Sequence, residues 1–413
     1  MGTDTSIIRG GEKVKKRYIK NDKKFGLKIE WNRIFDMIEK ENLIPSERYF
    51  KRLNFTDTAW NILMSGRSVG KTTTFLLLAL ILYREYEIKT MYLRENNEMT
   101  RQKSLESLFD TIEVLGLISK IFGDKWNSVR LRAGKWYLQK VEDGEIKEES
   151  EDYFMRNLSL DRTAIYKSSL VEPFGDLIIF DEFISKYYMR GDFGDLLDLI
   201  KTIKRDRLST VVVMLANTTE VTSEYFDELQ IREYIEKMSV GQSRTVTTEQ
   251  GTNIYIEFIE NKRDKEEKKE EKEKFFGFKN AKVKAIDGTD WVFNEYPHYV
   301  IKRKRNNTMT VNEVIQRGFF VKTLNKYYAI DIASSDLGIC AIVHNSNAPD
   351  ERLTNRVYTL DFLSNQKEIY ALGTTLFDKW FWNLYFNGKF LYANNACGNA
   401  IENYVRRAKL RGR

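Results

Sequence analysis

The sequence has no apolar run long enough to cross a lipid bilayer. Its longest, Phe75–Tyr83, is far shorter than the roughly 20 residues that a membrane-spanning helix needs. The first residues include basic ones, but no apolar segment follows them, so no signal peptide is expected. We therefore exclude a membrane-spanning protein and expect no membrane partner.

Cysteine and histidine are scarce. Cys340 and Cys397 are far apart, as are His298 and His344, and the sequence holds no others of either type. Their spacing matches no structural zinc site, so we interpret all four as ordinary core or surface residues. Two distant cysteines are typical of a protein from a reduced, cytosolic compartment.

Positive charge is what the chain has in excess. Its 413 residues carry a net charge of +7 and are 42% hydrophobic, which is enough for two domains with cores of their own. Lysine and arginine gather at 13–24, 301–305 and 406–413. Each stretch alone is more typical of a solvated face, but the three together favour a nucleic-acid partner.

From about Tyr49 onward, strand-like runs alternate with helical ones. Four runs are apolar almost throughout, which is typical of strands buried on both faces of a mainly parallel sheet. Helices are expected at Lys71–Glu85 and near Asp192–Arg205, so the pattern predicts an α/β, doubly wound fold. The expected strands are 60–65, 89–94, 176–182 and 210–217, with a fifth at 253–260.

Two segments stand outside this alternation. Residues 1–48 are expected to form a basic arm with an amphipathic helix near 31–42. Within 130–149, Asp143-Gly144 lies between two semi-alternating runs, which predicts a hairpin in an antiparallel appendage.

A charged linker and a smaller domain follow. Residues 261–296 begin almost entirely with Lys, Glu, Asp and Arg, and Glu/Lys pairs can hold such a segment helical, although a disordered tether is the alternative. The remaining residues, 297–413, predict a second α/β domain. Its strands are expected within 327–345 and 356–364, and its helices over 368–386 and about 396–410.

The stretch "NILMSGRSVGKTTTFLLLALILY" (61–83) resembles a phosphate-binding loop between a strand and a helix. Ser65 stands where the usual pattern has its first glycine, and only the backbone is needed there. Backbone amides at a helix N-terminus attract phosphate, while Lys71 supplies charge and Thr72 a hydroxyl for Mg²⁺. The alternative is an ordinary strand-to-helix turn. The predicted ATP-binding residues are Ser65, Gly66, Arg67, Ser68, Val69, Gly70, Lys71, Thr72 and Thr73.

Two carboxylates end the apolar run "LIIF". Asp181 is expected at the C-terminal end of a buried strand, where ligands bind in open α/β sheets, and there it can hold Mg²⁺ with Thr72. Glu182 can orient or deprotonate the attacking water. The adjacent pair favours ATP hydrolysis over nucleotide binding alone. We therefore expect a P-loop ATPase domain over 49–260 with ATP and Mg²⁺ as cofactors.

Four further residues are candidates for catalysis. Asn217 ends the strand expected beside that of Asp181, close to the γ-phosphate, although alone it is more often a turn residue. Arg205 and Arg207 are candidates for an arginine that reaches a neighbouring subunit's γ-phosphate; a solvated helix end is the alternative. Arg67, inside the loop, must meet phosphate, a carboxylate or solvent, because an unpaired buried charge is costly.

These motifs together resemble the DNA-packaging (encapsidation) ATPases of small podophages with protein-primed genomes, the salasmavirus and picovirus group, which are related to large terminases. The matching features are Arg67 in the loop, the run Ile179–Ile184, and Arg205 and Arg207 shortly before Asn217. The resemblance extends through roughly 50–413. It has no counterpart for the basic arm or the charged linker.

The resemblance implies a homo-oligomeric ring, expected to be a pentamer, that pumps double-stranded DNA into a preformed capsid at the expense of ATP. Its partners would be the portal protein of the procapsid and, as in some relatives, a packaging RNA. The protein would act in the host cell cytoplasm, docked on the procapsid, and be absent from the mature virion.

The resemblance also implies a ribonuclease H-like second domain with a degenerate nuclease site. Asp331 stands where a first metal-binding carboxylate belongs, with Asp336, Asp361 and Glu402 as candidate companions, but two-metal cleavage needs several converging carboxylates. Two alternatives stay open. One is a terminase-like protein with an active nuclease, and the other is a DNA-binding adaptor with a vestigial ATPase.

Overall fold

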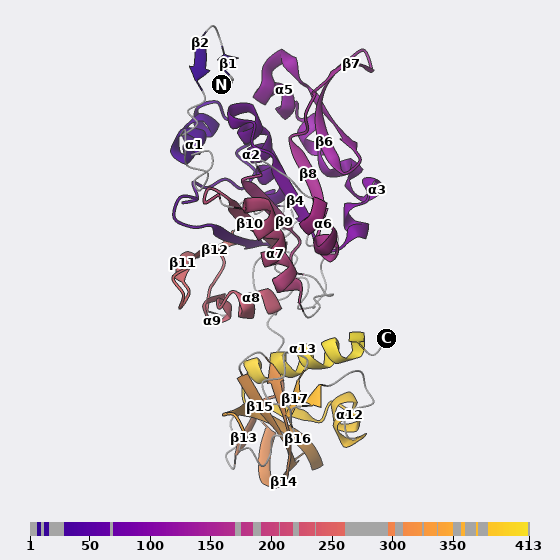
Figure 1. The fold of residues 1–413 in the computed structure, drawn as a ribbon. Coiled ribbons are helices and arrows are strands. Elements are labelled where there is room, and N and C mark those ends of the chain that lie inside the picture. Colours follow the sequence, from indigo (N-terminus) through magenta and orange to yellow (C-terminus); the bar gives the residue numbers. More distant parts are fainter. Residues whose placement is uncertain are drawn as a thin grey trace, which may run out of the picture. The chain divides into compact units, whose positions relative to one another are not determined.

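The computed structural model describes residues 6–9, 12–15, 29–66, 69–169, 175–184, 191–205, 207–217, 223–235, 237–260, 296–301, 309–323, 326–336, 338–349, 357–359, 369–370 and 379–411. The chain divides into two units, Met1–Val292 and Phe293–Arg413, and each is described by itself (Figure 1). Almost all of the predicted linker lies outside the described residues. Across the described ranges, no helix is both long and apolar enough to span a membrane.

A large, mostly parallel sheet forms the centre of the first unit. The predicted strands are confirmed to within a residue at each end, and one more, whose sequence "MRNLS" is not continuously apolar, joins them. In their order across the sheet, the parallel strands are β12 (Asn253–Ile259), β3 (Trp60–Ser65), β10 (Val211–Asn217), β9 (Leu177–Asp181), β4 (Thr90–Arg94) and β8 (Met155–Ser159).

Antiparallel strands extend the sheet at both edges. Beyond β8 lie β6 (Lys135–Glu142), β5 (Ser128–Arg132) and β7 (Glu145–Glu149), the last two each paired with β6. Asp143 and Gly144 join β6 to β7 with φ values of 52° and 77°, so the predicted hairpin is confirmed. At the other edge, β11 (Ser243–Thr247) pairs with β12.

Helices cover both faces because the strands are apolar on both. In β3, Leu63 points into one core layer, while Ile62 and Met64 point into the other. The first layer lies under α2 (Lys71–Tyr86), α1 (Trp31–Lys40), α4 (Asp110–Val114) and α5 (Leu117–Phe122). The second lies under α6 (Thr163–Ser169), α7 (Asp192–Lys204), α8 (Glu224–Glu228) and α9 (Arg232–Ile235). The predicted α/β fold is confirmed.

The second unit is a mixed sheet with helices packed on it. Three antiparallel strands form its middle: β14 (Met309–Thr323), β15 (Lys326–Ser335) and β16 (Gly338–Ser346). The remaining strands are parallel to their neighbours: β13 (Tyr299–Ile301), β17 (Val357–Thr359), β18 (Ile369–Tyr370) and β19 (Phe390–Tyr392). Helices α12 (Lys379–Phe386) and α13 (Asn395–Arg411) pack on this sheet through the aromatic and aliphatic cluster that they share with it.

One sequence expectation for this unit needs correction, and one long strand was missed. The helix expected over 368–386 covers only Lys379–Phe386 among the described residues, and Ile369–Tyr370 instead forms a strand, as β-branched and aromatic residues favour. The strand β14 was not predicted. Its pairing with β15 shifts register at three places, so its sequence lacks the regular alternation that identifies a strand.

Candidate active site

The loop between β3 and α2 requires a glycine immediately before the helix. Gly70 has a φ of 83°, in the left-handed region, and a Cβ there would lie 2.5 Å from Arg48 Cδ. The helix α2 then begins at Lys71, and Thr73 lies half-buried in its first turn. Of the predicted loop residues, Arg67 and Ser68 lie outside the described residues.

Lys71 brings its ammonium group into the interior of the site. The residue is only 7% exposed, and its Nζ donates to Ser65 Oγ and, at 3.4 Å, to Asn217 Oδ1. Burial lowers the pKa of Lys71 to about 8, although the charges of Asp181 and Glu182 act in the opposite sense. The hydroxyl and amide oxygens that Lys71 contacts carry no charge, so an anion placed here would gain a strong partner.

Ser65 does more than replace a glycine. It ends β3, is fully buried, and its hydroxyl donates to the Gly66 carbonyl at 2.6 Å while accepting from Lys71. The sequence predicted only that a small residue is tolerated at this place. In the structure the side chain also helps to position the lysine.

Thr72 and Asp181 face each other from α2 and the end of β9. The Thr72 hydroxyl donates to the two carboxylate oxygens at 3.1 and 3.3 Å, and the hydroxyl of Tyr92 donates to Oδ2 at 2.7 Å. A hydroxyl beside a carboxylate fits Mg²⁺, which prefers few protein ligands with water and phosphate completing its octahedron. No three His, Cys, Asp or Glu residues come together for a metal in the described part of the chain, which leaves water and phosphate to complete such a site.

Glu182 follows Asp181 in a left-handed turn with a φ of 55°, and its side chain is 50% exposed. Arg94, at the end of β4, donates to the Glu182 carboxylate. The same guanidinium donates to the Tyr92 hydroxyl at 3.1 Å and lies 3.5 Å from Asp181 Oδ2. Sequence reasoning missed Arg94, although it is a polar residue that ends an apolar strand, the same signal that identified Asp181 and Asn217.

Asn217 reaches the site because β10 lies between β3 and β9. In these parallel pairs, Asn217 is in register with Ser65, and Leu215 with Asp181. The carboxyl ends of the strands therefore bring Ser65, Asn217, Asp181 and Arg94 to one edge of the sheet, where α/β proteins bind ligands.

Arg205 and Arg207 lie at the opposite edge. The seven residues of β10 separate them from Asn217, a span of about 23 Å, so neither reaches the loop of its own chain. Arg207 is buried, and its guanidinium donates to Asp176 Oδ1 at 2.7 Å and to the Ile203 carbonyl at 2.8 Å. Arg205 is exposed at the end of α7.

A cavity of about 610 Å³ lies beside the loop. It is lined by residues between Ile38 and Lys51, by Val69, and by Gly241 and the end of β12. The Tyr49 amide donates to the Val69 carbonyl at 3.1 Å, which joins this wall to the loop. Both Tyr49 and Tyr255 donate to the Glu257 carboxylate in the same wall, at 2.9 and 2.6 Å.

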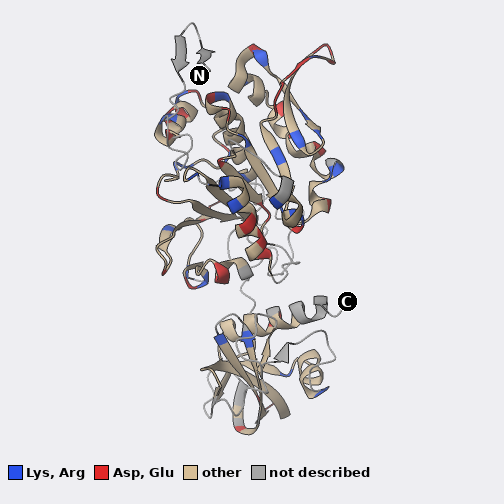
Figure 2. Ribbon diagram, in the orientation of Figure 1, with Lys and Arg blue, Asp and Glu red and all other residues tan. Residues whose placement is uncertain are grey.

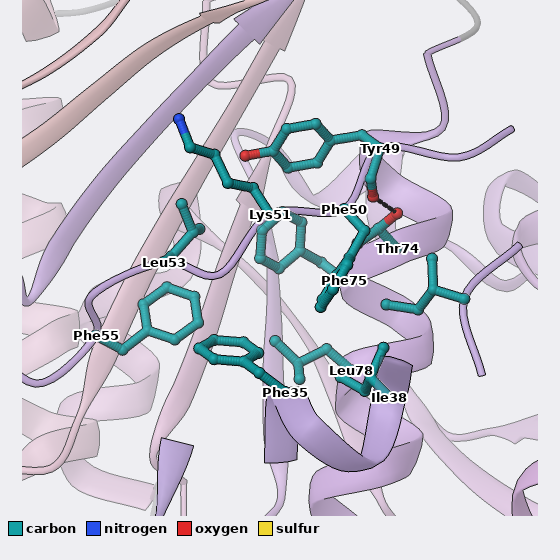
Figure 3. A pocket seen from close by; sticks show the side chains of 11 residues that line it. Phe35, Ile38, Tyr49, Phe50, Lys51, Leu53, Phe55, Thr74, Phe75 and Leu78 are labelled. Atoms are coloured by element: carbon teal, nitrogen blue, oxygen red, sulfur yellow. Dashed lines mark hydrogen bonds between the residues drawn. The ribbon is translucent and has the colours of Figure 1, made fainter. Parts of the chain in front are cut away.

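The wall is held by apolar packing against α2. Figure 3 shows Phe35, Phe50, Phe75 and Leu78 around a small space. Its volume is about 10 Å³, which is too small for more than a single water. The Thr74 hydroxyl donates to the Tyr49 carbonyl above it (Figure 3). This second space is therefore part of the core, and the larger cavity is the one that can take a ligand.

In the second unit, Asp331 is buried on β15. Its carboxylate accepts from His344 Nε2 at 3.0 Å and from the Gly318 amide at 3.3 Å. Of its expected companions, Asp336 is exposed in a turn, Glu402 accepts from the Tyr296 hydroxyl, and Asp361 lies outside the described residues. The described carboxylates form no group that could hold two metal ions.

No protein-family model and no curated protein sequence matches this chain. Among solved structures, the bacteriophage Phi-29 viral genome packaging motor assembly is similar, with a TM-score of 0.53 at 16% identity, over 88% of this chain and 100% of that one. The Phi-28 gp11 DNA packaging motor is similar with a TM-score of 0.52 at 20% identity, over 84% and 94% of the two chains. The protein therefore has the fold of the chains of these phage DNA-packaging motors.

Proposed function

We propose that this protein is an ATPase that drives double-stranded DNA through the portal into a preformed viral capsid. One observation carries the proposal: Lys71, Thr72, Asp181 and Asn217 meet at one edge of the sheet, with Glu182 beside them. This occurs in a fold shared with phage DNA-packaging motors. The convergence supports nucleotide hydrolysis, and the shared fold supports its coupling to DNA movement.

The described residues have roles that follow from their positions. Lys71 and the amides of 65–73 bind the phosphates, and Asn217 lies where it can touch the γ-phosphate or the attacking water. Thr72 and Asp181 would hold Mg²⁺, which when bound neutralises charge on the β- and γ-phosphates. Glu182 orients the attacking water once it has left Arg94. We assign Arg67 to the phosphates as well, with a partner that changes between the ATP and ADP states.

The nucleoside has a place in the large cavity. That cavity is lined by Val69 and by Arg48, which lies against Gly70, and it offers both polar groups and the Tyr49 ring. Its volume, about 610 Å³, suits a nucleoside.

The active assembly is proposed to be a homo-oligomeric ring, with a pentamer as the expected form. Arg205 cannot reach the nucleotide of its own chain, yet it is exposed at the edge of the unit, as an arginine acting on a neighbouring subunit must be. Arg207 is held in its buried ion pair with Asp176 and is the weaker candidate for that role. The same proposal names the portal protein and a packaging RNA as partners. It places the protein in the host cytoplasm.

The domain limits are part of the proposal: a basic arm to residue 48, whose helix α1 packs on the core of the ATPase, the ATPase to 260, a linker to 296, and a ribonuclease H-like domain thereafter. That last domain is proposed not to cut DNA, because Asp331 is occupied by His344 and Gly318. Incubation with supercoiled plasmid and Mn²⁺ tests this. Nicking that is lost in Asp331→Ala would establish the nuclease alternative instead.

The decisive experiment measures ATP hydrolysis with and without duplex DNA and with and without purified procapsids. We expect duplex DNA to stimulate turnover and procapsids to raise it further. A rate of ATP hydrolysis that does not change when duplex DNA is added would contradict the packaging role. A protein that hydrolyses no ATP under any of the four conditions would support the adaptor alternative.

A further inference from the structure

In the part of the chain that the structure describes, no helix covers one face of the first unit's antiparallel extension. On β5 and β6, Leu131, Trp136 and Leu138 point into the core layer beneath α2. Their alternates point the other way, and the helices that cover that side, α6 to α9, pack on the central strands only as far as β8. The uncovered face, which we call the basic face, bears Arg130, Arg132, Lys135, Tyr137 and Arg156.

Strand register places these cations in rows. Arg132 pairs with Lys135, and Lys135 with Arg156, so three cations cross three neighbouring strands. Arg130 pairs with Tyr137 in the next row. Figure 2 shows the resulting Lys and Arg segments on β6 and β8.

Tyrosine rings orient the cations. The Arg132 guanidinium lies 4.6 Å from the Tyr137 ring, and Lys135 and Lys89 each lie 4.3 Å from the Tyr153 ring. Such contacts restrict the rotamers of long side chains without removing their charge. The side chains of Arg130 and Arg132 stay 51% and 56% exposed, so their charge faces solvent.

Two carboxylates temper the positive charge. Glu149 lies 3.8 Å from Arg130 and 3.2 Å from Arg132, and Asp152 lies 2.7 Å from Lys89. Arg130 and Arg132 are half-exposed, so their pairs with Glu149 are worth little and a polyanion can compete for them. The negative charge of Glu149 should therefore weaken anion binding at this face, and removing that charge should raise the affinity for a polyanion.

We propose that the basic face binds the phosphate backbone of duplex DNA. This inference rests on the proposed function, because it takes the moving substrate as its occupant. Nucleic-acid interfaces are much more positively charged than protein–protein interfaces, so four cations on neighbouring strands favour nucleic acid over a protein. Contacts from Arg, Lys and Tyr to phosphates carry no sequence information, which a protein that moves DNA of any sequence requires.

The test measures binding of the full-length protein to a mixed-sequence duplex at several salt concentrations. In Arg130→Gln/Arg132→Gln, the slope of log affinity against log salt should become shallower by about 2, since each phosphate contact contributes about 0.9. Lys120→Gln/Lys140→Gln is the matched control. It removes two charges from the other side, where both lysines donate to backbone carbonyls, and should leave the slope unchanged.

A third variant tests whether misfolding, rather than lost charge, explains weaker DNA binding by the arginine variant. Glu149→Gln keeps a partner for Gln139 but removes the charge beside the arginines, so it should bind duplex DNA more tightly than wild type. A damaged fold cannot produce that gain. DNA-free ATP turnover should be the same in all three variants.

Three results would overturn the inference. If the wild-type protein binds DNA and the arginine variant keeps the wild-type salt slope, the basic face does not bind DNA, while the proposed function stands. The same measurement is made with duplex RNA. An arginine variant that loses RNA binding but keeps DNA binding would assign the face to RNA. A wild type that binds no duplex DNA would refute the proposed function, and the basic face with it.

Discussion

The guanidinium group of Arg94 donates a hydrogen bond to the carboxylate of Glu182, across two neighbouring strands. A carboxylate held by a cation is not free to orient water. Under the proposed mechanism, the pairing is a resting arrangement of the site, from which Glu182 would depart before hydrolysis.

Replacing Arg94 by Gln should raise the DNA-free rate of ATP turnover. An ion pair to a half-exposed carboxylate is worth about 0.5–1 kcal/mol, so its loss should raise the rate roughly two- to fivefold and shrink the stimulation by DNA. Steady-state ATPase assays with and without duplex DNA measure both. A DNA-free rate at or below wild type would mean that Arg94 supports catalysis rather than restraining it.

Lys71→Ala and Glu182→Gln should fail at different steps. Without Lys71 the phosphates lose their buried cation, so both ATP binding and turnover should disappear. Without the Glu182 charge, ATP should still bind, while turnover should fall by a factor on the order of 10²–10⁴. Fluorescent-nucleotide binding beside turnover separates the two, and loss of binding in Glu182→Gln would count against its assigned role.

ATP binding should take up a proton at alkaline pH. The pKa of Lys71, lowered to about 8 by burial, should rise when phosphate arrives. At pH 7 the lysine is already charged in the free protein, so little uptake is expected. Above pH 8 it is largely neutral, so binding should take up close to one proton and weaken as the pH rises. Calorimetry in buffers of different ionisation enthalpy measures this, and equal uptake at pH 7 and pH 9 would contradict it.

Arg205 should act on the site of a neighbouring subunit. Arg205→Ala rings and Glu182→Gln rings should each be inactive, but mixing the subunits should restore part of the turnover, because some interfaces then join an intact Arg205 to an intact Glu182. Mixed assembly is checked by mass. The absence of rescue in rings shown to be mixed would remove Arg205 from catalysis.

Arg207→Ala should destabilise the first unit, whereas Arg205→Ala should not. Removing Arg207 leaves Asp176 buried without its cation, which costs about 3–5 kcal/mol. Arg205 is exposed, and its replacement should change stability by less than about 0.5 kcal/mol. Denaturant unfolding followed by tryptophan fluorescence compares the two. Equal stabilities would show that the ion pair contributes nothing.

Local sequence patterns predicted the loop, the parallel strands and the polar residues that end them. The loop between β3 and α2 was identified because its turn, glycine and helix all lie within one stretch of sequence. The apolar runs identified the parallel strands for the same reason, since a strand buried on both faces needs apolar residues at every position. Asp181 and Asn217 followed, because each ends such a run.

The features that the sequence did not predict depend on contacts between distant residues or on irregular strand pairing. Arg94 and Glu182 are distant in sequence and meet only because β4 and β9 are neighbours in the sheet. Arg205 and Arg207 look alike in the sequence, yet Asp176 buries one of them and leaves the other exposed. The shifted register of β14 removed the alternation that would have revealed it.

The sequence by itself determined that an apolar strand, a turn ending in glycine and an apolar helix would follow one another. That information is local, because backbone conformation and burial pattern are properties of consecutive residues. Only the tertiary structure decided that Ser65 positions Lys71, that Arg94 holds Glu182, and that Arg207 is locked to Asp176. Those outcomes depend on which strands become neighbours, and strand order is settled by the packing of the whole sheet.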